Sequence, residues 1–234
     1  MVMGFVLILT NSCKKDNNND NTTQNSGIIF NSKLTYGTVT DISGNVYKTI
    51  TIGTQTWMAE NLKVTRYRNG DSIPKISDGT AWSNLTTGAY CDYRNIVSNG
   101  TTYGKLYNWY SIMDSRNICP TGWHIPNDTE WEKLYAYLGG YEQTTSDKLR
   151  ETGITHWAYI NDGATNASGF TALPGGMRDY GGIFTDIGQT CFLWSSTPAG
   201  DYYNLDADYY YLDSGANSGG GSKKNGLSVR CLKD

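Results

Sequence analysis

Charged side chains are scarce in this sequence. Asp, Glu, Lys and Arg together make up 18% of the 234 residues, and the formal net charge is -3. Proteins that bind nucleic acids through the phosphates carry a basic excess clustered on one face. The composition therefore argues against a nucleic-acid partner.

The sequence also has few residues and motifs that carry chemistry. It contains two histidines, His124 and His156, and no HExxH or CxxC pattern that would hold a metal ion. Ser195 and Ser196 lack the GxSxG context of a nucleophilic serine, and the GGGSKK stretch at 219–224 lacks the spacing of a phosphate-binding loop. We therefore expect no enzyme activity and no cofactor, with His124 in a structural role.

Long apolar runs are missing except at the N-terminus. Residues 1–9 read MVMGFVLIL, which is too short to cross a bilayer as a helix. A short apolar segment that ends in small or polar residues is typical of a secretory signal, and an ending at cysteine resembles the bacterial lipobox. We expect a signal peptide over 1–12 and lipidation of Cys13. The alternative is a frayed apolar tail with a chance cysteine.

The residues after Cys13 are strongly polar. Residues 14–26 contain no apolar side chain, so this stretch cannot contribute to a core. We therefore assign 13–33 to a disordered polar tether between the lipid and the domain. Lys14, Lys15 and Asp16 also resemble the surface-export signal of Bacteroidetes lipoproteins. That resemblance implies an outer-membrane lipoprotein exposed at the cell surface and held by its lipid alone.

The globular pattern begins at residue 34 and mixes helical and strand periodicity. The clearest helix covers 127–138, where Asn127 and Glu130 have the spacing of a capping box and an apolar face follows. Residues 46–52 alternate and are β-branched, which predicts a strand with a hairpin partner at 56–58. This mixture predicts an α+β fold. Further short helices are expected at 106–113 and 146–151, and short strands at 182–184, 192–195, 209–212 and 227–232.

Six ordered blocks of the sequence resemble one known family. They are WMAENL (57–62), YGKLYNW (103–109), CPTGWHIP (119–126), GFTALPGG (169–176), WSST (194–197) and SVRCL (228–232). Together they resemble the Fibrobacter succinogenes major paralogous domain, to which we assign residues 34–234. That family is similar to C-type-lectin-like domains, which implies two short helices, a small antiparallel sheet and long loops rich in Gly, Asn and Tyr.

Five cysteines are present, and none belongs to a CxxC pair. The four that follow Cys13 allow two disulfides in three pairings, among which the residues alone do not choose. The family resemblance implies one of them, Cys119 with Cys231, as in C-type lectin folds. For Cys91 and Cys191 two outcomes stay open, a second disulfide or two free buried thiols.

The last part of the sequence has a strongly biased composition. Tyr, Asn, Asp, Ser and Gly make up nineteen of the twenty-five residues from 201 to 225. These residue types dominate antibody combining sites, where Tyr supplies contact area and the small polar residues adapt. We predict a ligand-binding surface here; the alternative is an ordinary Tyr-rich strand pair with polar loops. The predicted contact residues are Tyr202, Tyr203, Asn204, Asp206, Asp208, Tyr209, Tyr210, Tyr211 and Asp213, with Trp82 and Trp157 as lesser candidates.

The aspartates of this stretch allow a second interpretation. Asp201, Asp206, Asp208 and Asp213 offer oxygen ligands for calcium, and the alternative is that they are solvated loop carboxylates. The sugar-binding motifs of lectins, Glu-Pro-Asn, Gln-Pro-Asp and Trp-Asn-Asp, do not occur.

We expect the chain to be a non-catalytic surface module that binds or adheres to a glycan or a protein. Three alternatives stay open. The biased C-terminal stretch is typical of proteins that a retroelement diversifies, which a reverse transcriptase gene beside the coding sequence would reveal. A relative of formylglycine-generating enzymes would use a reactive cysteine pair as an oxidase. A purely structural coat protein would have no ligand.

Overall fold

The computed structural model describes residues 27–158, 161–199 and 207–234. The predicted signal peptide, Cys13 and the first two thirds of the predicted tether lie outside these ranges. So do residues 201–206 of the biased stretch, which include the predicted residues Asp201, Tyr202, Tyr203, Asn204 and Asp206. Within the described ranges, no helix is long and apolar enough to cross a membrane.

The first sheet contains five short strands. They are β1 (Gly37–Thr40), β2 (Val46–Ile52), β3 (Gln55–Met58), β12 (Leu232–Lys233) and β6 (Trp123–His124), in this order. The predicted hairpin is confirmed, since β2 pairs antiparallel with β3 and places Ile50 opposite Trp57. Strand β12 lies between β3 and β6, so the end of the chain completes the sheet that its first strands begin.

Helix α4 (Asp128–Leu138) confirms the predicted helix and its starting point. The Asn127 side chain accepts a hydrogen bond from the Glu130 N–H, and the Glu130 carboxylate accepts one from the Asn127 N–H. This capping box satisfies two N–H groups that the first turn leaves unpaired. Gly139, at a φ of 123°, ends the helix. The buried face consists of Trp131, Leu134, Tyr135 and Leu138.

The helix expected at 106–113 is wrong in its first half. Leu106–Tyr107 forms strand β5, which pairs with β4 (Tyr90–Cys91), and helix α3 (Trp109–Ile112) begins only afterwards. The reason is Asn108, whose side chain accepts hydrogen bonds from the N–H groups of Ala89 and Ser111. An asparagine in that role caps a helix and so fixes where α3 starts.

The described ranges contain five α-helices, whereas the residue pattern predicted three and the family resemblance implied two. Helix α5 (Gln143–Leu149) overlaps the helix expected at 146–151 but begins and ends earlier. The others are single turns or little more, a length that gives almost no periodic signal in a sequence. They are α1 (Gly79–Ser83) and α2 (Val97–Thr102), beside the 3-10 turn η1 (Tyr93–Asn95).

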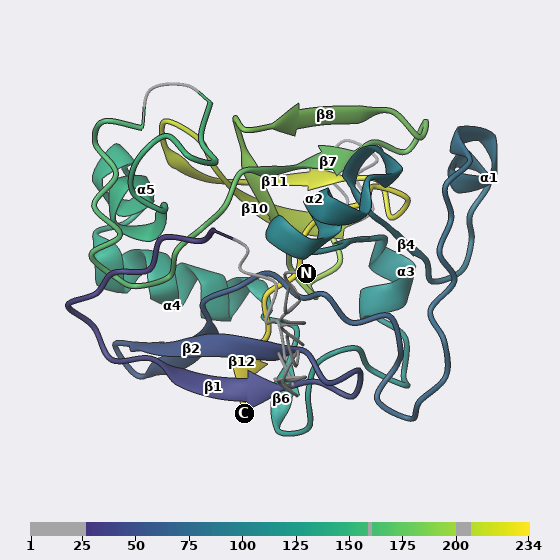
Figure 1. Ribbon diagram of the computed structural model, residues 1–234, viewed down its shortest axis with the longest axis horizontal. Coiled ribbons are helices and arrows are strands. Elements are labelled where there is room, and N and C mark those ends of the chain that lie inside the picture. The colour runs from purple at the N-terminus through teal and green to yellow at the C-terminus, as the bar shows by residue number, and fades with distance from the viewer. Residues whose placement is uncertain (1–26, 159–160, 200–206) are drawn as a thin grey trace, which may run out of the picture.

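The second half of the chain forms two further antiparallel sheets. One is the hairpin of β7 (Gly175–Arg178) with β8 (Phe184–Ile187). The other has the strand order β11-β10-β9 and contains β9 (Cys191–Trp194), β10 (Ala207–Leu212) and β11 (Ala216–Gly221). In Figure 1 the five-stranded sheet lies along the lower side and these strands along the upper side, with α4 between them on the left.

Two of the four strands expected in this half need correction, and one strand was missed. The strand expected at 182–184 begins only at Phe184, because Gly182, at a φ of 89°, belongs to the turn before it. The stretch 227–232 forms isolated bridges and only the short β12. Strand β11 was not expected, since its sequence ANSGGG has no β-branched or aromatic residue. The strands expected at 192–195 and 209–212 correspond to β9 and β10.

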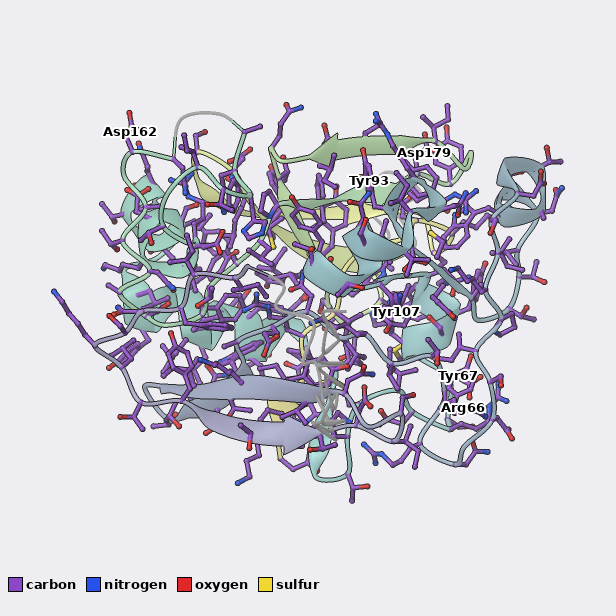
Figure 2. The ribbon with its side chains drawn as sticks, viewed as in Figure 1. Arg66, Tyr67, Tyr93, Tyr107, Asp162 and Asp179 are labelled. Carbon is purple, nitrogen blue, oxygen red and sulfur yellow. A yellow bond between two sulfur atoms is a disulfide. The ribbon has the colours of Figure 1, made fainter. Side chains whose placement is uncertain are left out.

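Aromatic side chains form much of the interior. Tyr107 is completely buried and donates its hydroxyl hydrogen to the carbonyl oxygen of Val64 at 2.7 Å (Figure 2). The Trp194 indole N–H donates to the Tyr107 carbonyl at 2.7 Å, which ties β9 to β5. Buried tryptophan and tyrosine are stable inside because their polar atoms find such partners.

The disulfide that the family resemblance implies is confirmed. Cys119 is bonded to Cys231 with the Cα atoms 5.9 Å apart, so the segment before β6 is linked to the segment before β12. A second disulfide between Cys91 and Cys191 is wrong, because both are buried free thiols. They lie in different hydrophobic clusters, Cys91 beside Trp82 and Cys191 beside α4.

Next to the disulfide, the Arg230 side chain is completely buried, and none of its partners among the described residues is a carboxylate. Its guanidinium donates hydrogen bonds to the Asn61 side chain at 2.9 Å and to the Thr171 carbonyl at 2.8 Å. It also donates to the carbonyl oxygens of Phe170 and Met58, and it lies 4.2 Å from the centre of the Phe170 ring. Burial lowers the pKa of Arg230 to about 10, which leaves it charged at neutral pH.

The packed domain begins earlier than residue 34, and the predicted tether is correspondingly shorter. The Ile29 N–H donates a hydrogen bond to the buried Glu151 carboxylate at 2.6 Å, and Phe30 packs against the cluster that contains α4. The Asn31 side chain donates to the Asn166 carbonyl at 3.0 Å. The apolar residues at 28–30 were the signal in the sequence for this packing.

Removal of the disulfide is expected to destabilise the fold strongly. The Cys119→Ala/Cys231→Ala variant should lose about 4–5 kcal/mol of unfolding free energy, because the two cysteines are 112 residues apart and their bond restricts the unfolded chain. Urea denaturation measures this loss. Cys91→Ala is the matched control, because it removes a free thiol and keeps the disulfide. A reductant should therefore lower the urea midpoint of Cys91→Ala by as much as it lowers the wild-type midpoint. Equal midpoints for the wild type and the double variant would contradict the prediction.

Candidate functional site

The sheet of β9, β10 and β11 has two different faces. Tyr209 is opposite Trp194 and Tyr211 is opposite Phe192, so these four side chains share one face. Tyr210 is opposite Leu193 on the other face. Alternation along β10 therefore divides the predicted tyrosine cluster between the two sides of the sheet.

Tyr210 belongs to the core, and its prediction as a contact residue is wrong. Only 2% of its surface is exposed. Its ring stacks on Trp131 with the centroids 5.1 Å apart and meets the edge of Tyr135 at 5.3 Å, which attaches β10 to α4. The lesser candidates, Trp82 and Trp157, are also buried, with their indole N–H groups bonded to the carbonyls of Lys224 and Ala172.

The opposite face presents three half-buried rings, which we call the aromatic shelf: Phe192, Tyr209 and Tyr211. The ring centroids of Phe192 lie 5.7 Å from Tyr209 and 6.0 Å from Tyr211, and the two tyrosines are 6.0 Å apart. These distances are those of rings in contact, so the three side chains hold one another in place. Phe192 came from no prediction, although it lies within a strand that the sequence indicated.

The glycines of β11 make room for the Tyr209 ring of the aromatic shelf. Gly219 is opposite Tyr209, and a Cβ atom at Gly219 would lie 3.3 Å from the Tyr209 ring. At Gly221 it would lie 3.2 Å from the same ring and 2.7 Å from the Asn225 side-chain nitrogen. An aromatic ring that covers glycines of a neighbouring strand is a known means of stabilising such a strand. Residues two positions apart lie on the same face of a strand. The spacing of Gly219 and Gly221 was therefore a signal in the sequence that a ring covers this face of β11.

Tyr211 also has a polar neighbour on the shelf. Asn217 is directly opposite it on β11 and is partly exposed, so its amide lies on the same face as the three rings. An amide offers two donors and one acceptor to a ligand. The aromatic shelf with Asn217 therefore combines apolar contact area with hydrogen-bonding groups.

Two predicted aspartates lie at opposite ends of β10. Asp208 is at its start, and Asp213 follows its end, where the Asp213 carboxylate accepts a hydrogen bond from the Gly215 N–H at 2.8 Å. Five residues of extended strand separate them by about 16 Å, so they cannot share an ion. Within the described ranges, no group of three or more His, Cys, Asp or Glu residues could hold a metal ion. The other two predicted calcium ligands, Asp201 and Asp206, lie outside those ranges.

Asp208 lies beside a second carboxylate, that of Asp128. Burial, and then the hydrogen bond and the charge of Asp128, raise the pKa of Asp208 to about 6. Asp128 is the first residue of α4, and its Oδ1 accepts a hydrogen bond from the Ser195 hydroxyl at 2.6 Å. Sequence reasoning did not find this pair, since eighty residues separate its members.

His124 has the structural setting that we expected. Its Nε2 lies 2.9 Å from Glu130 Oε1 and its Nδ1 lies 2.7 Å from Asp234 Oδ1. Burial acts to lower the pKa of His124, but the hydrogen bonds with Asp234 and Glu130 outweigh it, and the pKa is raised. The imidazole thus joins the start of α4 to the last residue of the chain.

The fold and this site define a mixed helix and sheet domain with several small antiparallel sheets and an aromatic surface. The model of the Fibrobacter succinogenes major domain matches residues 50–233, and the chain belongs to this family. The resemblance carried by the six sequence blocks is thereby confirmed. No match to the chain was found among curated proteins or among solved structures.

Substitution of neighbouring tyrosines should separate the two faces of the sheet. Tyr210→Ala is expected to cost about 3–5 kcal/mol, the range of buried aromatic truncations, because it removes the ring packed between β10 and α4. Tyr211→Ala is the matched control and should cost about 1 kcal/mol or less, since its ring is partly exposed. Thermal or urea denaturation measures both values. A larger loss for Tyr211→Ala than for Tyr210→Ala would overturn this assignment of faces.

Proposed function

We propose that this domain is a non-catalytic binding module whose ligand contacts the aromatic shelf. The observation that carries the proposal is the set of three rings, Phe192, Tyr209 and Tyr211, held half-buried on one face of a sheet. Rings fixed by one another lose little conformational freedom when a ligand binds. Phe192 and Tyr209 also pack against the interior, which makes the surface rigid.

The ligand that we propose is a glycan or a short segment of a protein. Aromatic rings provide apolar area for the C–H face of a sugar or for a side chain, and Asn217 provides hydrogen bonds to hydroxyl or peptide groups. A typical stable protein interface buries about 800 Å² per partner, far more than three half-buried rings offer. The size of the aromatic shelf therefore favours the glycan.

The two free thiols support a non-catalytic role. Burial raises the pKa of Cys91 and that of Cys191 to about 12, whereas a reactive cysteine is exposed and has a lowered pKa. The two also lie in separate hydrophobic clusters. An oxidase that depends on a cysteine pair is thus less well supported than a binding module.

Two further parts of the proposal concern ancestry and location. We propose a relationship to C-type-lectin-like domains, supported by the disulfide between Cys119 and Cys231 and by the pairing of β12 with β3. We also propose that the domain is displayed on the outer membrane through a lipid on Cys13, supported by the apolar run that precedes this cysteine.

Binding should depend on the aromatic shelf. The full chain carrying Cys13→Ser, which prevents lipidation, should bind a subset of neutral glycans on an array. Tyr211→Ala and Asn217→Ala should each weaken that binding by about tenfold, the effect of losing one good contact. Tyr180→Ala is the matched control, because Tyr180 is 64% exposed at the turn between β7 and β8. Undiminished binding by the Tyr211→Ala variant would contradict the proposal.

A further inference from the structure

The start of β10 is attached to the N-terminus of α4 by a compact polar cluster. The Ser195 hydroxyl donates to Asp128 and accepts a hydrogen bond from the Thr197 N–H at 3.1 Å. The Asp128 N–H donates to the Thr197 hydroxyl at 3.0 Å. The Asp208 backbone joins the cluster, since its carbonyl accepts from the Ser195 N–H and its N–H donates to the Thr197 carbonyl.

The two carboxyl groups of this cluster are not equivalent. Asp128 lies in the first turn of α4, where the helix dipole favours a negative charge, and it receives the Ser195 hydroxyl. Asp208 lies on a strand, and among the described residues no hydroxyl or N–H group donates to its carboxylate. When two adjacent carboxyl groups share one proton, the less stabilised anion holds it. The proton therefore resides on Asp208, whose O–H donates to Asp128.

Among the described residues, Asp128 is the charged group that acts on Asp208. The end of β9 contributes only the neutral hydroxyls of Ser195 and Thr197. On the β11 side, Asp208 is opposite Gly220, which has no side chain. The remaining ionisable neighbours of the strand, Glu132 and Tyr141, act on Tyr210.

We propose that Asp128 and Asp208 form a proton-sensitive latch, which fixes the start of β10 against α4 in mildly acidic medium and loosens it at neutral pH. Asp208 directly precedes Tyr209 on the strand, so the latch governs the order of the aromatic shelf. That consequence rests on the proposed function; the latch itself does not.

The direction of the pH effect follows from the sign of the shift. The pKa of Asp208 rises from its usual 3.8 to about 6 on folding. Between about pH 4 and pH 6 the folded chain therefore binds more protons at this site than the unfolded chain does, and its stability falls as the pH rises. Above pH 6 the two carboxylates are both charged and repel each other. Most carboxyl groups in proteins have a lower pKa in the folded chain than in the unfolded chain, so they make stability rise with pH.

The experiment compares thermal unfolding of the full chain, carrying Cys13→Ser, at pH 5.0 and pH 7.5. The amount by which Asp208→Asn melts above the unsubstituted chain should be about 3 °C larger at pH 7.5 than at pH 5.0, because an amide donates to Asp128 at both pH values. Asp162→Asn is the matched control, an exposed carboxylate at the periphery of the molecule (Figure 2). Its melting difference from the unsubstituted chain should be the same at both pH values. If the difference in melting temperature between Asp208→Asn and the unsubstituted chain were also the same at pH 5.0 and pH 7.5, the latch would be overturned.

Two further measurements separate the latch from a merely structural contact. Carbon NMR of the Asp208 carboxyl group should show a midpoint near pH 6, which Asp128→Asn lowers by removing the charge and the hydrogen bond of Asp128; a midpoint below pH 5 in the unsubstituted chain would overturn the latch. Amide exchange at Tyr209–Leu212, corrected for the intrinsic rates, should be faster at pH 7.5 unless Asp208 is replaced by Asn. Unchanged exchange would remove the link to the aromatic shelf. None of these measurements uses a glycan. An absence of binding on the glycan array would therefore count against the proposed function and not against the latch.

Discussion

The buried guanidinium of Arg230 is the interaction on which the architecture depends most. It bonds to groups from two separate parts of the chain: Met58 and Asn61 at and just after the end of β3, and Phe170 with Thr171 before β7. The adjacent Cys231 is covalently bonded to Cys119. A buried charge without a carboxylate is tolerated only when oxygen atoms replace its lost hydration. The final segment can therefore occupy one position only, and the small sheets are arranged around it.

The aromatic shelf is a consequence of this arrangement and of strand alternation. Once β9 is tied to β5 through Trp194 and Tyr107, one face of its sheet is directed to the core around Tyr107, and the rings at its outer end are left half-exposed. Tyr210, one residue along, has to point the other way, toward α4. Within this run of three tyrosines, Tyr210 therefore stabilises the core, and Tyr209 and Tyr211 form part of the surface.

Features with strong local signals could be predicted from the sequence. The capping box at Asn127 and the alternation of β2 are local, and both were correct. The disulfide came from the family resemblance rather than from the residues alone. Strand β11 could not be predicted, because its glycines have no intrinsic preference for a strand and take their conformation from β10. For the same reason the composition of 201–225 suggested a binding region but could not identify which tyrosines were buried. The pairing of Asp128 with Asp208 is purely tertiary and left no trace in the sequence.

The order of the five-stranded sheet has a consequence for how the domain folds. Strand β12 pairs with β3 and with β6, although 175 residues separate Trp57 from its partner Leu232. Contacts between residues so distant along the chain cost much conformational entropy before they form, and they slow folding. The sheet that begins with the first strands therefore cannot be completed until the last segment has reached it.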